Sequence, residues 1–150
     1  MTEEAVPAGG ALPVDGTDVL AVLVTRPDQA NPALPTTDGL AALQSILLQQ
    51  PPPGIAVVAH VGDTPSEPLE LDATETLVVQ VHVPDATNFG QAVEQALESL
   101  AVQQIPGAAR ASWLWLIHDD MVMMPGALAT MLILGRTSGS IAAIGPKQVS

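Results

Sequence analysis

The chain has no cysteine and few basic residues, and both absences exclude classes of function. Without cysteine there is no disulfide framework and no thiol nucleophile. Against 16 acidic residues there are only 4 basic ones, which gives a net charge of −12. This charge argues against binding to nucleic acid and against electrostatic docking on anionic lipid. The basic residues are Arg26, Arg110, Arg136 and Lys147.

Aromatic residues and long apolar runs are also scarce. The only Phe, Tyr or Trp residues are Phe89, Trp113 and Trp115, so Ala, Val and Leu must fill most of one hydrophobic core, in which we expect both tryptophans. No segment approaches the roughly 20 apolar residues that a membrane-spanning helix needs. The first residues lack the basic and apolar regions of a signal peptide. We therefore expect a cytoplasmic domain without a membrane span.

Apolar and polar segments alternate along the chain in a way that predicts an α/β fold. Apolar runs predict strands at residues 19–24, 55–59, 77–83, 113–117 and 141–144. Helical spacing of apolar positions predicts helices at residues 38–50 and 88–103, and another helix with Pro125 in its first turn and Gly135 at its end. Residues 1–17 have no such period and are expected to form a flexible leader before a domain at residues 18–150. Alternating strands and helices predict a Rossmann-like, mostly parallel sheet.

The fourth predicted strand ends in His118, Asp119 and Asp120, which are side chains that can bind metal. Its continuous apolar run predicts burial on both faces, and ligands of open α/β sheets bind at the carboxyl ends of the strands. Paired carboxylates suit a hard cation such as Mg²⁺ or Mn²⁺, which can hold the phosphates of a nucleotide. A solvated turn or a helix N-cap would use the same residues, so both interpretations stay open.

A series of segments, in this order along residues 18–148, carries a family resemblance. They are VLAVLVTR, LPTTDGLAAL, VVAHVGDT, NFGQAVEQAL, WLWLIHDDMVMMPGALATML and IAAIGPKQ. Together they resemble the family-2 glycosyltransferases of the GT-A fold, in particular an actinobacterial membrane-associated branch. The resemblance implies the donor-binding half of a GT-A three-layer sandwich, with the C-terminal acceptor part absent. The catalytic base is then expected beyond Ser150, in a longer parent protein that could be associated with the inner face of a membrane.

The resemblance also implies a metal-assisted site for the nucleotide-sugar donor. The family motif after the fourth strand is D-x-D, and this chain has His118 at the first acidic position and Asp120 at the last. Asp120 is therefore the expected ligand of Mg²⁺ or Mn²⁺, with His118 in support, although imidazole suits a hard cation less well. Asp119 would support the metal or contact the ribose.

Further donor contacts are implied at the ends of the other strands. The expected residues are Thr25, Arg26, His60, Asp63, Asn88 and Gly90. The family typically has Asp where this chain has His60, and Asp63 could take over that role from the following turn. His60 could equally be a solvated histidine. Asn88 could be only a helix N-cap, and Gly90 could only allow close approach of helix and sheet.

The function implied by the resemblance is transfer of a sugar, with inversion, from a nucleotide-diphosphate donor to a cell-envelope glycan acceptor. The alternative is a degenerate, non-catalytic GT-A-like module for binding or assembly, which His60 and His118 in place of Asp favour. A generic Rossmann nucleotide-binding domain would need a glycine-rich first turn, and TRPDQANP offers none. A half-domain also leaves a sheet edge or core face uncovered, so self-association is expected.

Overall fold

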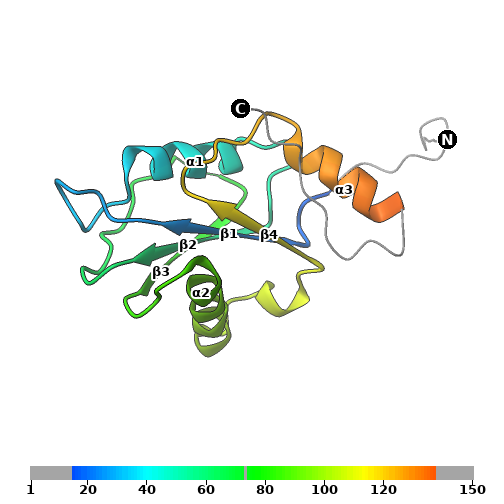
Figure 1. Cartoon of the computed structure of the whole chain (residues 1–150). Coiled ribbons are helices and arrows are strands. Elements are labelled where there is room, and N and C mark those ends of the chain that lie inside the picture. The colour runs from blue at the N-terminus through cyan, green and yellow to red at the C-terminus, as the bar shows by residue number, and fades with distance from the viewer. Residues whose placement is uncertain (1–14, 73, 138–150) are drawn as a thin grey trace, which may run out of the picture.

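The computed structural model of the chain describes residues 15–72 and 74–137, and an open parallel sheet forms its centre (Figure 1). The strands are β1 (Val19–Thr25), β2 (Ile55–Val61), β3 (Leu77–Val83) and β4 (Trp113–His118). They lie in the order β3-β2-β1-β4, and each neighbouring pair is parallel. The predicted α/β class and parallel sheet are confirmed, and the first and fourth strands are neighbours. The strand expected at residues 141–144 lies outside the described residues.

Helices cover both faces of the sheet (Figure 1). Helices α1 (Thr37–Leu47) and α3 (Ala127–Thr137) pack on one face, whereas α2 (Phe89–Gln103) and the short 3-10 helix η2 (Ala108–Arg110) pack on the other. The side chains of β1 alternate between the two cores: Ala21 and Leu23 contact the α1 side, and Leu20 and Val22 the α2 side. Because β1 is buried on both faces, its apolar sequence is that of a central parallel strand.

The two helices that follow β1 and β3 begin at capping side chains. The Thr36 hydroxyl accepts a hydrogen bond from the backbone N–H of Gly39 at 3.0 Å, and the Asn88 side chain accepts one from Gln91 at 2.9 Å. Each cap satisfies a backbone donor that has no partner within the first turn of its helix. Asn88 is therefore a helix N-cap, which was the alternative to its expected role as a donor contact.

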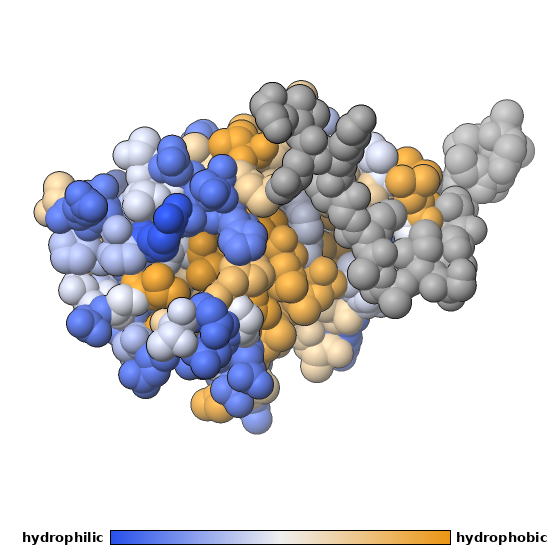
Figure 2. Space-filling view, in the orientation of Figure 1, coloured by the Kyte–Doolittle hydropathy of each residue, from blue (hydrophilic) through white to orange (hydrophobic). Residues whose placement is uncertain are grey.

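β4 is the edge strand of the described sheet, and the prediction that it is buried on both faces is wrong. Trp115 and Ile117 lie in the core beneath α1 and α3, with Trp113 half-buried beside them. On the opposite face Leu114 and Leu116 are 46% and 45% exposed. Figure 2 shows a hydrophobic surface in the centre of the view, over β4 and between α1 and α2. An apolar run thus marks a strand, but not how many layers cover it.

Gly135 lies within α3 and does not end it, contrary to the prediction. A Cβ at this position would lie 2.6 Å from Cη2 of Trp113, which is closer than side chains pack. The glycine therefore allows α3 to contact the indole ring directly.

The last residues of the expected leader, 15–17, are part of the fold. The backbone N–H of Gly54 donates to the Gly16 carbonyl at 2.9 Å, and a Cβ on Gly16 would overlap with the Pro52 carbonyl. This contact joins the entry to β1 and the entry to β2. No helix in residues 15–72 and 74–137 has the length and apolar character to cross a membrane.

Candidate functional site

The carboxyl ends of β1 and β4 lie side by side at the point where the chain reverses its direction across the sheet. From β1 the chain runs through α1 to β2 and then to β3, and it returns through α2 to β4 on the other side of β1. Since α1 and α2 cover opposite faces, a crevice opens between these two strand ends, which is the usual ligand site of open α/β sheets. A pocket of about 380 Å³ lies there, lined by Arg26, Val61, Ala86, Thr87, Asn88, Phe89, His118, Asp119 and Asp120.

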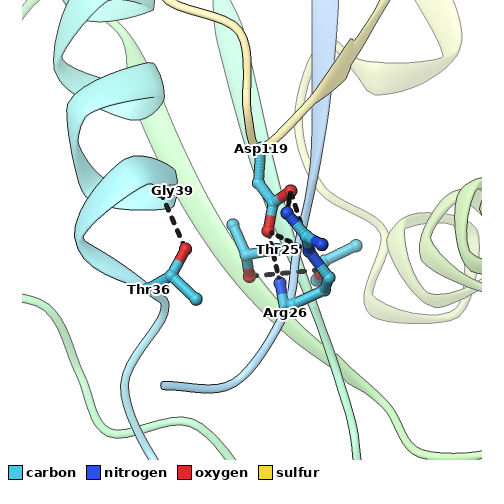
Figure 3. A network of polar contacts seen from close by, with 6 residues as sticks. Thr25, Arg26, Thr36, Gly39 and Asp119 are labelled. Atoms are coloured by element: carbon cyan, nitrogen blue, oxygen red, sulfur yellow. Dashed lines mark hydrogen bonds and ion pairs between the residues drawn. The ribbon is translucent and has the colours of Figure 1, made fainter. Parts of the chain in front are cut away.

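Arg26 and Asp119 connect the two strand ends directly (Figure 3). One carboxylate oxygen of Asp119 accepts the backbone N–H of Arg26 at 2.8 Å, and Nε of Arg26 is 3.2 Å from both oxygens. The Nη2 atom lies 3.0 Å from the other oxygen. The Asp119 side chain is 6% exposed and that of Arg26 is 63% exposed, so a buried carboxylate holds a guanidinium that faces solvent.

This pairing determines what each residue can offer a ligand. Both oxygens of Asp119 are used by Arg26, so Asp119 positions Arg26 and is poorly placed to bind a cation. Nη1 of Arg26 has no partner among the described residues and can donate to an anion. The hydrogen bond to Asp119, and after it the charge of Asp119, raise the pKa of Arg26 above its ordinary value, so the group is a permanent cation.

Asp120 is the remaining carboxylate of the pocket and is exposed. Within residues 15–72 and 74–137 no group of at least three His, Cys, Asp or Glu side chains converges as a metal site. The donor set does fit Mg²⁺ or Mn²⁺ held by one carboxylate and completed by phosphate oxygens, since such ions commonly bind with one or two carboxylates plus a nucleotide. Asp120 would then be the protein ligand.

The imidazole ring of His118, the residue expected to support Asp120, stacks on Phe89. The ring centroids are 4.0 Å apart, with an angle of 22° between the planes. Phe89 is the first residue of α2, directly after the Asn88 cap, and His118 is the last residue of β4. The stack therefore fixes the start of α2 against the end of the edge strand.

Thr25 and His60, both expected to contact the donor, are fully buried and outside the pocket. Nε2 of His60 is 2.9 Å from the Pro32 carbonyl, which can only accept, so this nitrogen carries the proton. Nδ1 then faces the hydroxyl of Thr25 at 3.4 Å. With both ring nitrogens engaged inside the protein, His60 holds the loop between β1 and α1, and neither residue lines the pocket.

The other expected residues divide between the pocket edge and its surroundings. Asn88 lines the pocket, but its side-chain oxygen is used as the cap of α2. Gly90 is exposed and its missing Cβ would meet only the side chain of Asn88, at an ordinary 3.5 Å, so close packing against the sheet does not explain this glycine. Asp63 is exposed after β2 and does not line the pocket.

Sequence reasoning missed two residues that hold the segment after Asp120, one in α1 and one just after it. The backbone N–H of Met123 donates to the Ser45 hydroxyl at 2.9 Å. Buried Gln49, just after α1, donates to the Met124 carbonyl at 3.0 Å and accepts from the N–H of Leu128 at 3.0 Å. No periodicity or motif marks these contacts, because each joins residues that are far apart in the sequence.

The fold and the pocket define a class of protein, an open parallel α/β domain with a polar pocket at its switch point. Within that class, comparison of the chain with known protein families, with curated proteins and with solved structures gives no match. The glycosyltransferase resemblance therefore remains a prediction, and a function has to be argued from the pocket.

Proposed function

We propose that this domain binds the nucleotide-diphosphate part of a sugar donor and belongs to a glycosyltransferase that modifies a cell-envelope glycan. One observation carries the proposal: the pocket at the switch point combines a fixed guanidinium, Arg26, with a free carboxylate, Asp120. A diphosphate that binds together with a metal ion can use both kinds of group. The guanidinium contacts its oxygens directly, and the carboxylate holds the cation that neutralises it.

The residues would divide the work as follows. Asp119 fixes the direction of the Arg26 side chain, so that little conformational entropy is lost when Nη1 binds a phosphate oxygen. Asp120 would hold Mg²⁺ or Mn²⁺, which stabilises charge on the departing diphosphate when it is bound. The pocket lies at the ends of two packed strands rather than on a long loop, which keeps Arg26 and Asp120 at a fixed position relative to each other.

A second candidate is a non-catalytic binding module, and a specific observation favours it. Of the three consecutive polar residues at the end of β4, Asp119 is occupied by Arg26 and His118 is stacked on Phe89, which leaves only Asp120 for a cation. A site with one free carboxylate can bind a nucleotide while contributing little to catalysis.

Calorimetric titration with UDP and with GDP, each with and without Mn²⁺, tests the proposal. We expect Mn²⁺ to increase the affinity of the parent chain for one of these nucleotides. In Asp120→Asn this increase should fall by about tenfold or more, as when a group supporting a metal is removed. The matched control is Glu98→Gln, which removes an exposed acid from the outer face of α2 and should leave the titration unchanged.

The outcomes separate the two candidates. Absence of UDP and GDP binding by the folded parent would refute the donor site. Nucleotide binding that is equal with and without Mn²⁺, and equal in Asp120→Asn, would refute the metal-assisted function and support the non-catalytic module.

A further inference from the structure

The stacked pair of Phe89 and His118 places an exposed ring in the wall of the candidate pocket. One face of the imidazole is covered by Phe89 at a centroid distance of 4.0 Å, and His118 is exposed on the face of β4 that it shares with Leu116. Both rings line the pocket, together with the apolar side chains of Val61 and Ala86. The pocket thus has an uncharged part with an aromatic surface and a charged part at Arg26 and Asp120.

Two features of His118 argue against a role as metal ligand. A histidine that binds metal through one nitrogen almost always donates its other N–H to a carboxylate or carbonyl, which fixes the ring. His118 has no such hydrogen-bond partner among the described residues, and it is fixed by ring stacking instead. An imidazole held by its face is suited to contact another flat ring.

We propose that the nucleobase of the bound nucleotide stacks on the open face of His118. The inference rests on the proposed function, because it assigns the base to the uncharged part of the same pocket whose charged part takes the diphosphate. Base and diphosphate are joined through a ribose, so one nucleotide fills both parts. Phe89 supports the platform from behind, since a stacked imidazole cannot turn away without losing that contact.

The experiment compares two ligands, a nucleoside diphosphate that has a base and pyrophosphate that has none. UDP, GDP and pyrophosphate are titrated in the presence of Mn²⁺ into the parent chain and into His118→Ala and His118→Phe. We expect His118→Ala to weaken binding of the nucleotide by about tenfold, the size of a contact between a base and an aromatic ring, and to leave pyrophosphate unchanged. His118→Phe keeps a flat ring and should retain the affinity for the nucleotide.

A matched control and a second variant make the result specific. Leu116→Ala removes an exposed side chain from the same face of β4 outside the pocket and should bind both ligands like the parent. Phe89→Leu removes the supporting ring and should weaken nucleotide binding but not pyrophosphate binding. Thermal unfolding of each variant shows that the comparison is made between folded proteins.

Each other outcome overturns the inference in a recognisable way. If His118→Ala and His118→Phe both lose pyrophosphate together with the nucleotide, His118 is a metal ligand. If His118→Ala binds the nucleotide like the parent, the base lies elsewhere while the proposed function stands. If the parent binds neither pyrophosphate nor a nucleotide, the proposed function itself fails.

Discussion

Replacing Gln49 with methionine should destabilise the whole domain, although Gln49 is an uncharged residue distant in the sequence from the candidate site. Gln49 is 1% exposed, and its side chain makes hydrogen bonds to two segments. Nε2 donates to the carbonyls of Ser45 at 3.1 Å and Met124 at 3.0 Å, and Oε1 accepts from the backbone N–H of Leu128 at 3.0 Å. Leu128 is the second residue of α3, so Gln49 supplies a helix cap from another part of the chain.

The expected loss follows from these contacts. Methionine has nearly the same shape as glutamine, so no large cavity forms and the change removes chiefly the hydrogen bonds. Each bond contributes about 1 kcal/mol net, and a buried N–H such as that of Leu128 costs about 1–3 kcal/mol when it is left without a partner. We expect the free energy of unfolding to fall by about 3 kcal/mol, which is a large share of the roughly 5–15 kcal/mol typical of a domain.

Urea unfolding followed by tryptophan fluorescence measures this loss, because Trp113 and Trp115 lie in β4, just before the segment that Gln49 holds. The matched control is Gln44→Met, which makes the same change at an exposed position of α1 and should cost less than about 0.5 kcal/mol. If the two variants unfold at the same urea concentration, the side chain of Gln49 does not hold α3, and the capping argument is wrong.

Further changes test how β4 and the residue that follows it are held. Asp119→Ala should lower the free energy of unfolding by about 2 kcal/mol, because the backbone N–H of Arg26 loses its buried acceptor. Asp119→Asn should lower it less, because an amide oxygen can still accept this hydrogen bond, and equal losses of the two variants in urea unfolding would contradict this. Gly135→Ala should destabilise the parent by about 1 kcal/mol or more, since overlap with Trp113 outweighs the gain of about 1 kcal/mol in helix propensity. In a Trp113→Ala background, Gly135→Ala should instead stabilise the domain. Thermal unfolding measures both effects, and a loss of stability in both backgrounds would show that overlap with Trp113 is not the cause.

The strands and caps could be predicted from sequence because their signals are local. Residues 19–24 and 55–59 are continuous apolar runs, and both form strands buried on both faces. Asn88 stands directly before a helical apolar period and caps that helix in the structure. Alternation of these elements was enough to predict the parallel sheet, but alternation does not give the order of the strands within it.

The site could be predicted only in part, because its contacts depend on distances that the sequence does not show. His60 was expected at the end of a strand, but β2 continues to Val61, so the histidine is inside the sheet and buried. The positions of Asp119 and Asp120 at the end of β4 were predicted correctly, whereas the ion pair of Asp119 with Arg26 was not. Neighbouring residues in a sequence can have opposite roles when one side chain points into the protein and the next points out.

The position of β4 at the edge of the described sheet has a consequence for the dynamics of the site. Among the described strands β4 pairs with β1 alone, whereas β2 pairs with both β1 and β3. A strand held on one side opens locally more often than one held on both sides, so on the pairing of the described residues we expect the amide hydrogens of β4 to exchange faster than those of β2. His118 and Asp120 are at the end of this less protected strand, whereas Arg26 follows the central strand. A ligand that contacts Arg26 and Asp120 together would connect the two strand ends and slow amide exchange along β4. Part of its binding energy would then be used to order the edge of the sheet.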